Sequence, residues 1–355
     1  MTAAEILRLA PSTQHGRWMS EACESGLVSV IVPTFNRGHV LLKTLESVRA
    51  QRYRPVEVLL VDDGSTDGTS ALVDEWTGAD VDGGELRLRH LRQAHRGAPA
   101  ARNLGLIESR GEFVQFLDSD DLLHPLKLQM QVERFSQDAE LDFVYAGTAF
   151  FKDDPDWSVA AYTGLPLKAE DDMLLSFLLG GAWNTVSGLY RRRTCVIIGP
   201  WNERTSILQD REYNIRFILG EPKIERMDET LSLQRKHGED RITGQRLSEP
   251  SLRGMYVSMT EGEQWIREAG RWNPAIEECF VRNLFGVARE AVLNGYVGLA
   301  RTVVDELEHL KPHRDLARRI AVYTFLARTS SGGRRAARGI QRFTTATKLV
   351  KSVWR

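Results

Sequence analysis

The sequence predicts an α/β protein built on a doubly wound, mainly parallel sheet flanked by helices, with a helical C-terminal extension. Over the first 120 residues, short apolar runs alternate with segments of helical periodicity, as a doubly wound sheet requires. From about residue 250 the strand signals stop and long helical periodicity replaces them. A chain of 355 residues also exceeds what one core usually absorbs, so we expect a main domain and an appendage.

The sheet domain begins with a strand–helix–strand unit. Leu27–Pro33 is apolar and ends in proline, which predicts a strand, and apolar residues then recur at helical spacing over residues 39–51. Val56–Val61 is a second apolar run. Because a strand, a helix and a strand follow one another within so few residues, we expect a parallel pair joined by a right-handed crossover.

The remaining elements continue this alternation. Helices are expected at about 68–76, 97–110, 125–135, 174–179 and 210–219, and strands at 86–91, 113–117, 143–148, 186–190 and 231–235. Residues 151–170 are polar and irregular, and such long loops often contact substrates. The segments are then a lead-in over 1–25, a sheet domain over 26–245, a helical region over 250–330 and a basic amphipathic tail over 331–355. Within the helical region, residues 275–310 and 312–328 are expected to form antiparallel helices.

Acidic residues follow two of the expected strands. Asp62 and Asp63 end the second strand, and Asp118, Asp120 and Asp121 follow the strand at 113–117. Open α/β sheets bind ligands at the carboxyl ends of their strands, and a divalent cation held by one or two carboxylates usually also holds substrate phosphates. A solvated acidic turn is the alternative for the second cluster taken alone. Neither a G-x-G-x-x-G nor a phosphate-cradling lysine loop is found, so a metal would have to replace them.

Four motifs together resemble glycosyltransferase family 2. They are Val30-Ile-Val-Pro-Thr-Phe-Asn36, Val61-Asp-Asp-Gly-Ser-Thr-Asp67, Ala101-Arg-Asn-Leu-Gly105 and Phe116-Leu-Asp-Ser-Asp-Asp121. The resemblance covers roughly residues 27–240 and leaves residues 250–355 outside. It implies a GT-A fold and an inverting, metal-dependent transfer of a sugar from a nucleotide-diphosphate donor to an acceptor hydroxyl.

The resemblance also implies which residues bind the nucleotide sugar. They are Pro33, Thr34, Phe35, Asn36, Asp62, Asp63, Arg102, Asp118 and Ser119. Asp63 would accept a hydrogen bond from the base, which favours uracil or thymine because both present an imide N–H. Arg102 would face the diphosphate. A turn residue for Asp62 and a helix-surface salt bridge for Arg102 are the alternatives.

By the same resemblance, Asp120 and His237 would hold Mn²⁺ or Mg²⁺, with Asp121 assisting or capping the next helix. Asp210 would be the general base that deprotonates the acceptor, although Gln209 stands where the family more often has glutamate. A helix cap is the alternative for Asp210, since aspartate is a favoured N-cap.

Trp183, Asn184 and Gly188 fall where related enzymes form the acceptor pocket, but a core tryptophan is an equal alternative for Trp183. Processive members carry a Q-x-x-R-W motif and transmembrane helices, and neither is found. We therefore expect a non-processive enzyme of bacterial-type polysaccharide, lipid-linked glycan or glycoconjugate synthesis.

Charge and cysteine usage bear on location and partners. From Lys311 onward there are twelve Lys or Arg and one acid, so this end carries +11 and the first 310 residues −12. A basic amphipathic end suggests an anionic membrane surface as a partner, whereas nucleic acid is not expected because no recognisable module is present. Three scattered cysteines favour reduced thiols, hence a cytoplasmic protein with peripheral membrane contact.

Two rival functions remain at this point. A nucleotidyltransferase uses a similar sheet and metal, but it normally needs a glycine-rich phosphate loop, which is absent. The second rival is a catalytically impaired module that only binds nucleotide sugars. Such a module is expected to have lost the acidic residues of the site, yet all of them are present.

Overall fold

The computed structural model describes residues 18–77, 85–159, 172–180, 182–205, 207–236 and 248–310. The chain divides into two compact units, Met1–His237 and Gly238–Arg355, and each is considered on its own. Residues 1–17, residues 160–170 of the expected loop, His237, the segment expected at 312–328 and the tail lie outside the described residues.

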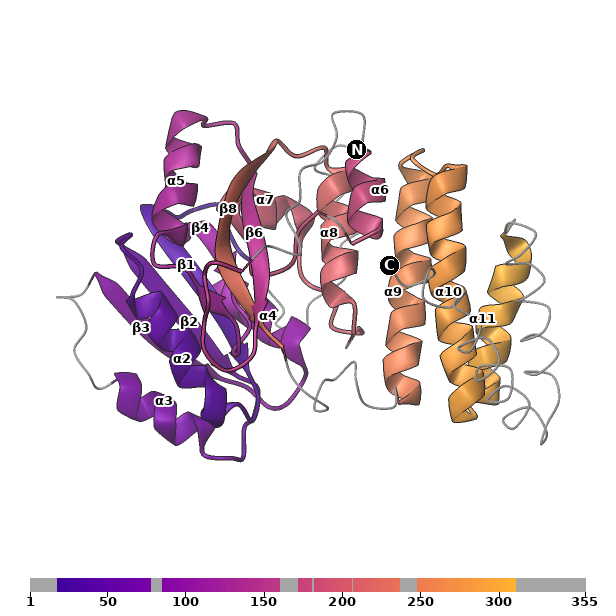
Figure 1. The fold of residues 1–355 in the computed structure, drawn as a ribbon, viewed down its shortest axis with the longest axis horizontal. Helices are drawn as coiled ribbons and strands as arrows, with labels where there is room; N and C mark the ends of the chain where they lie inside the picture. Colours follow the sequence, from indigo (N-terminus) through magenta and orange to yellow (C-terminus); the bar gives the residue numbers. More distant parts are fainter. Residues whose placement is uncertain are drawn as a thin grey trace. The chain divides into compact units, whose positions relative to one another are not determined.

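The first unit is organised around one sheet (Figure 1). Its strands, in the described part of the chain, run in the order β3-β2-β1-β4-β7-β6-β8-β5. Their bounds are β1 Glu24–Thr34, β2 Val56–Asp62, β3 Leu86–Arg92, β4 Gly111–Phe116, β5 Leu122–Leu123, β6 Phe143–Phe151, β7 Gly188–Arg191 and β8 Ile224–Arg235. Pairings among β1, β2, β3 and β4 are parallel, as is β6 with β8, whereas β7 and β5 pair antiparallel with their neighbours. The mainly parallel sheet is therefore confirmed.

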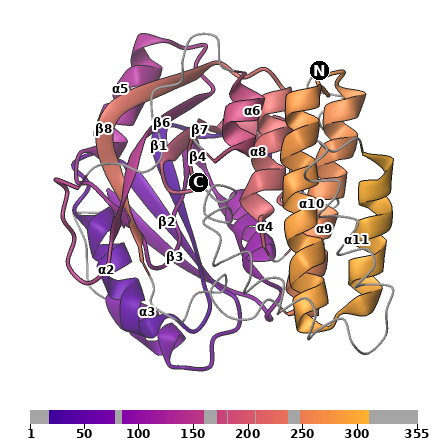
Figure 2. The same ribbon diagram turned by 45° about the vertical axis from the view of Figure 1, so that its right-hand side comes forward.

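Helices pack on both faces of this sheet (Figure 2). Their bounds are α2 Gly38–Arg49, α3 Thr69–Thr77, α4 Ala98–Glu108, α5 Lys127–Gln137, α6 Met173–Leu178, α7 Arg192–Ile198 and α8 Gln209–Leu219. Alternate residues of β1 point to opposite faces. Val30 and Val32 join the core shared with Leu41 and Leu45 of α2. On the other face, Ile31 lies so close to Gly105 of α4 that a Cβ there would overlap its Cγ2 atom.

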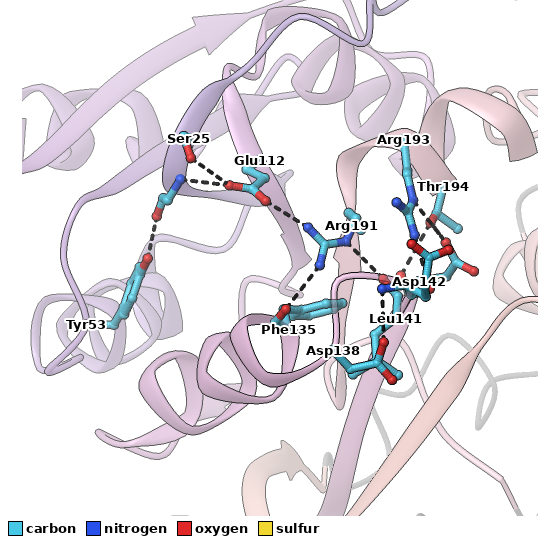
Figure 3. Close-up of polar contacts among 12 residues, drawn as sticks. Ser25, Tyr53, Glu112, Phe135, Asp138, Leu141, Asp142, Arg191, Arg193 and Thr194 are labelled. Atoms are coloured by element: carbon cyan, nitrogen blue, oxygen red, sulfur yellow. Dashed lines mark hydrogen bonds and ion pairs between the residues drawn. The ribbon is translucent and has the colours of Figure 1, made fainter.

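An arginine-centred network holds the end of the sheet where β4 begins (Figure 3). Arg191 of β7 donates to Glu112 Oε1 at 2.8 Å and to the Leu141 carbonyl at 2.9 Å. Glu112 Oε2 in turn accepts from the Gly26 N–H at 2.9 Å, and Gly26 O accepts from the Tyr53 hydroxyl at 2.5 Å. These bonds join β1, β4, β7 and the turn before β6 at the end opposite the acidic strand ends.

A lysine without a counter-charge lies in the core beside β4. Lys127, at the start of α5, is fully buried and donates to Gln115 Oε1 at 2.5 Å and to Gln131 Oε1 at 2.6 Å. Both glutamines donate onward to backbone carbonyls, including those of Val186 and Ser187. Burial lowers the pKa of Lys127 well below its ordinary value.

Lys127→Met should therefore reduce the pH dependence of stability. Between the lowered folded pKa and the unfolded value of about 10.4, the unfolded chain holds a proton that the folded chain lacks, so the free energy of unfolding rises with pH. The substitution removes that contribution. Urea unfolding at a series of alkaline pH values should give a flatter profile, while Lys43→Met, on an exposed face of α2, should keep the wild-type slope. Equal slopes for Lys127→Met and wild type would contradict the assignment.

The second unit contains α9 Glu249–Glu268, α10 Pro274–Asn294 and α11 Val297–His309. Ser248 and Asn273 cap the first two helices through their side-chain oxygens. The continuous helix expected over 275–310 is wrong, because Gly295 adopts φ 85° and ends α10, after which α11 begins. Glycine takes this left-handed conformation at little cost. No described helix is both long and apolar enough to cross a membrane.

Candidate active site

Three adjacent strand ends form the site. Thr34 at the end of β1 lies in register with Asp62 at the end of β2, and Ile31 lies in register with Phe116 at the end of β4. The Leu117 N–H then donates to the Ile31 carbonyl at 3.0 Å, which keeps the chain beside β1 as it leaves the sheet. The loops that carry the predicted nucleotide residues consequently leave the sheet side by side.

The loop after β1 is tied to the loop after β2. Asn36 has a positive φ of 52°, which asparagine tolerates better than most residues. Its N–H donates to Ser65 Oγ at 2.9 Å, and its Oδ1 accepts from the Thr66 N–H at 2.8 Å. Pro33 and Thr34 are buried inside the strand, whereas Phe35 stays 39% exposed at the mouth of the site.

Asp62 organises the turn that follows β2. Its Oδ1 accepts from the Ser65 N–H at 2.9 Å, and its Oδ2 accepts from the Ser70 hydroxyl. Burial by itself would raise the pKa of Asp62, but the hydrogen bonds from Ser65 and Ser70 bring it below the ordinary value. These contacts are those of the turn residue that was the alternative for Asp62.

Asp63 holds the segment between β3 and α4. Its Oδ1 accepts from Gln93 Nε2 at 2.7 Å and from the Arg96 N–H at 2.9 Å. Its Oδ2 accepts from the Gly97 N–H at 2.8 Å and lies 2.9 Å from His95 Nδ1. That Asp63 accepts a hydrogen bond from a nucleobase N–H stays a prediction. A bound nucleobase would have to share the carboxylate with the groups that already contact it.

Arg102 reaches the acidic strand end from α4. Its guanidinium is only 5% exposed, donates from Nη2 to Asp118 Oδ1 at 2.6 Å and lies 4.6 Å above the Trp201 ring. Its Nε and Nη1 are buried and find no hydrogen-bond partner among the described residues. A surface salt bridge does not fit these contacts. Buried donors of a cation without partners are costly, and a phosphate oxygen would satisfy them.

Asn103, beside Arg102 on α4, holds the loop that contains Trp201 and Glu203, which the sequence did not assign to the site. Its Nδ2 donates to the Trp201 carbonyl at 2.9 Å and to Glu203 Oε1 at 2.9 Å, and its Oδ1 accepts from the Trp201 N–H at 2.8 Å. Trp201 stacks on Tyr213 of α8, with ring centroids 4.2 Å apart. Asn103 stands within the quoted Ala101–Gly105 motif, and this signal could have pointed to it.

Asp210 lies in the first turn of α8. The N-cap residue is Leu208, with φ 58° and no side-chain cap, so Asp210 is not the N-cap residue, although backbone N–H groups of the first turn lower the pKa of its carboxyl. Burial raises the pKa of Asp210 above its ordinary value, while nearby Arg102 lowers it and Asp118 raises it. Asp210 therefore shares one electrostatic environment with Arg102 and Asp118, although the three come from different elements.

The other acids of the strand end are held differently from one another. Asp120 lies 3.8 Å from the Arg37 guanidinium, and Ser119 is buried in the turn. Asp121 is buried and accepts from the Arg235 N–H of β8 at 3.0 Å. Burial, together with the charges of Asp120 and Asp118, raises the pKa of Asp121 well above its ordinary value.

The donor set suits a hard divalent cation. Asp118 and Asp120 offer carboxylate oxygens from one turn, and Mg²⁺ or Mn²⁺ commonly binds one or two carboxylates together with substrate phosphates. Among the residues whose structure is described, no cluster of three or more His, Cys, Asp or Glu side chains forms a complete metal site. His237, the other predicted ligand, lies outside those residues.

The expected acceptor residues need a correction. Trp183 is buried among Phe143, Tyr145 and Phe177, with ring centroids 5.2 to 5.3 Å away, and its Nε1–H donates to Asn214 Oδ1 at 3.0 Å. It is the core tryptophan of the alternative, because its faces are covered and its N–H is satisfied.

The two other acceptor candidates also have contacts within the fold. Asn184 accepts from Thr148 Oγ1 at 3.0 Å. Gly188 lies against the Phe143 ring, where a Cβ would overlap the ring atoms. Their contact with an acceptor stays a prediction.

Comparisons with known proteins agree with this geometry. Residues 29–191 match the model of the family described as Glycosyl transferase family 2, so this part of the chain is similar to that family. It is 34% identical over 125 residues to an uncharacterized glycosyltransferase of Rickettsia felis, covering 35% of this chain and 19% of the relative. It is 35% identical over 120 residues to the UDP-Glc:alpha-D-GlcNAc-diphosphoundecaprenol beta-1,3-glucosyltransferase WfgD of Escherichia coli, covering 34% of this chain and 44% of that relative. The matches thus span less than half the length of these relatives.

Solved structures agree on the fold. The S. aureus TarS fragment 1–349 in complex with UDP-GlcNAc has a TM-score of 0.54 at 17% identity, covering 87% of this chain and 92% of that one. The mannosyltransferase PcManGT of Pyrobaculum calidifontis, in complex with GDP-Man and Mn²⁺, has a TM-score of 0.53 at 16% identity, covering 98% and 93%. The GT-A-like architecture that the sequence predicted is thereby confirmed.

Proposed function

We propose that the protein is an inverting, metal-dependent glycosyltransferase that moves a sugar from a UDP or dTDP donor to an acceptor hydroxyl. The observation that carries the proposal is the convergence of Arg102, Asp118 and Asp210 from three elements at the carboxyl edge of the sheet. A cation, a candidate ligand-binding acid and a candidate base that influence one another electrostatically support a single reaction site. Neither rival function needs a base there.

Asp210 is the proposed general base. An inverting displacement is in line, so the base must take the acceptor proton on the sugar face opposite the leaving diphosphate. A raised pKa suits this role, because a base whose pKa lies closer to the working pH accepts a proton more readily. The charge of Arg102 lowers the pKa of the same carboxyl and so favours its ionised form, the form that can accept a proton.

Arg102 is the proposed partner of the leaving diphosphate. Its Nε and Nη1 groups, which lack partners in the described part of the chain, can donate hydrogen bonds to phosphate oxygens without breaking the bond between Nη2 and Asp118. Donors already fixed before the charge develops stabilise a transition state at little reorganisation cost. Trp201 beneath the guanidinium keeps that plane in position.

Asp120, with His237, is the proposed holder of Mn²⁺ or Mg²⁺, and Asp118 lies beside the same phosphates. A bound divalent cation would neutralise charge on the departing diphosphate as a Lewis acid. Asp121 has a different role, since its contact with Arg235 fixes β8 against the strand end.

Donor and acceptor classes follow from the relatives. Similar folds were solved with UDP-GlcNAc and with GDP-Man plus Mn²⁺, and the Escherichia coli relative is named for transfer to a diphosphoundecaprenol-linked sugar. A lipid-linked glycan acceptor is therefore proposed, with the basic C-terminal tail beside an anionic membrane surface in the cytoplasm.

The proposal is tested with the full chain, Mn²⁺ and a panel of nucleotide sugars, first by the shift of the melting temperature and then by release of radiolabel from the stabilising donor. A UDP- or dTDP-sugar should stabilise the protein and be slowly hydrolysed even without acceptor. Stabilisation by no nucleotide sugar would overturn the proposal, and binding without any turnover would favour the impaired-module alternative.

Asp120→Ala should lose the metal dependence of nucleotide binding. Wild-type protein should bind UDP more tightly with Mn²⁺ than with EDTA, and the substitution should remove at least about tenfold of that gain, since even outer-shell changes cost this much at metal sites. Titration calorimetry measures it. Glu133→Ala, an exposed acid on α5, is the matched control and should keep the gain. An unchanged gain in Asp120→Ala would contradict the role.

A further inference from the structure

Two aromatic rings stack beside Asp63, the residue proposed to bind the nucleobase. His95 stacks on Phe35 with centroids 4.0 Å apart and an interplanar angle of 23°. Both are accessible: the side chain of His95 is 57% exposed and Phe35 is 39% exposed. An aromatic face that is open to solvent is the surface on which a nucleobase stacks, and here an imidazole already lies on it.

The same imidazole uses the last acceptor position of Asp63. A carboxylate offers about four lone-pair directions. The two Oδ1 directions receive Gln93 Nε2 and the Arg96 N–H, and one Oδ2 direction receives the Gly97 N–H. His95 Nδ1 lies 2.9 Å from Oδ2, toward the remaining direction, and also contacts the Asp63 backbone carbonyl oxygen at 3.2 Å. Since an ionised carboxylate only accepts, this nitrogen carries the proton.

Hydrogen bonds hold the backbone around His95, whereas its side chain is 57% exposed. The Gln93 N–H donates to the Asp62 carbonyl at 3.0 Å, and the Arg96 and Gly97 N–H groups bind Asp63. The backbone at Gly64, with φ 82°, packs closely against the backbone at His95, because a Cβ at position 64 would lie 3.0 Å from the His95 N atom. Of the four donors to Asp63, two are therefore backbone groups and Gln93 is half-buried, while the exposed imidazole is the one that solvent can replace.

We propose that His95 occupies the nucleobase site in the unliganded protein and is displaced when the base binds. The inference rests on the proposed function, because it takes Phe35 and Asp63 as base contacts. The nucleobase takes the place of the imidazole and stacks on the Phe35 ring. Its imide N–H takes the Oδ2 direction that His95 Nδ1 gives up. The contacts of His95 with the Phe35 ring and with Asp63 Oδ2 are thus replaced by contacts of the same kind, and its contact with the Asp63 backbone carbonyl is given up.

This exchange makes His95 a determinant of base selectivity. A base with an imide N–H restores the hydrogen bond that Asp63 loses, so uracil meets little net cost. Cytosine has a lone pair at the equivalent ring nitrogen and leaves Asp63 without its donor. In the wild-type protein UDP should therefore bind more tightly than CDP, although both present a ring of the same size to Phe35.

His95→Ala tests the displacement by titration calorimetry with UDP in Mn²⁺. Without the imidazole there is no stack to break, and UDP should bind about two- to tenfold more tightly than to wild type. Pyrophosphate, which has no base, should bind both proteins equally. Unchanged or weaker UDP binding in His95→Ala, with pyrophosphate binding unchanged, would overturn the inference, because it would mean that the imidazole stays and contributes to the base site.

The histidine proton resonances of the intact chain provide a direct readout. The Phe35 ring should shift the His95 ring protons upfield in the free protein, and His95→Ala identifies them among the eight histidines. Saturating UDP should move these resonances to the positions of an exposed histidine, and pyrophosphate should leave them in place. Resonances that keep their ring shift with UDP bound would overturn the inference.

The two levels of the argument fail separately. If wild-type protein binds neither UDP nor dTDP, the proposed function is wrong. If it binds UDP but His95→Ala gives no gain and the resonances do not move, the proposed function stands and the displacement of His95 is wrong.

Discussion

Asp210→Asn should lower the rate constant of sugar transfer by about 10²- to 10⁴-fold, the usual contribution of a positioned base, while the Kd for UDP stays close to that of the wild type. Asparagine keeps the shape and the hydrogen-bonding capacity of the side chain but cannot accept the acceptor proton. Because Asp210 is proposed to contact the acceptor hydroxyl and not the nucleotide, binding and turnover should separate. Single-turnover transfer and calorimetry on the same preparation measure the two effects.

The pH profile gives the same prediction a second readout. Only the ionised form of Asp210 accepts a proton, so transfer should increase with pH through a pKa above the ordinary value, as burial dictates. The residual activity of Asp210→Asn should lack this acidic limb. Asp228→Asn, the same change at a side chain that is 90% exposed on β8, is the control and should keep both rate and profile. A loss below tenfold in Asp210→Asn would remove it from the base role.

Arg216→Ala should destabilise the first unit by about 3–5 kcal/mol, as breaking a buried ion pair from one side commonly does. Arg216 and Glu212 of α8 are both 0% exposed and 2.7 Å apart. Arg216 also donates to the Ile198 carbonyl and to the Pro200 carbonyl, the latter at 2.7 Å. Burial raises the pKa of Glu212 and Arg216 lowers it, so removal of the arginine leaves a buried carboxyl without its charge partner.

Urea unfolding measures this loss, and two variants control it. Arg282→Ala breaks a pair with the same i,i+4 spacing on α10, but its side chains are 52% and 32% exposed, so little change is expected. The double substitution Glu212→Leu with Arg216→Met should lose less than Arg216→Ala alone, because no buried charge is left over. A double variant less stable than Arg216→Ala would contradict the charge argument.

Much of the fold was predictable because it depends on local pattern. The apolar runs that became β1, β2 and β4 are buried on both faces, and residues of that kind mark parallel strands. The short elements α7 and β5 were not predicted. Helix α7 begins with two polar residues, Arg192 and Arg193, and is only seven residues long. Strand β5 has two residues, which pair with β8 from far along the chain.

The sequence proposed individual residues for the candidate site but not the contacts between them. The motifs identified Arg102, Asp118 and Asp210, while their shared environment depends on the tertiary contact between α4 and the loop at Trp201. The expected role of Trp183 was wrong because a sequence cannot tell an aromatic ring in a pocket from one in a core. The stack of His95 on Phe35 joins residues sixty positions apart, and no local sequence pattern predicts such a contact.

The close approach of Gly105 to Ile31 has a consequence for how the proposed activity could be tuned. Arg102 stands one helical turn before Gly105, so the depth at which α4 sits on the sheet sets how far the guanidinium extends toward a ligand. A methyl group at position 105 would lift the helix and withdraw the cation without altering any functional group. If Arg102 binds the donor as proposed, affinity for the donor would also depend on the spacing between the helix and the sheet, which the glycine at position 105 sets.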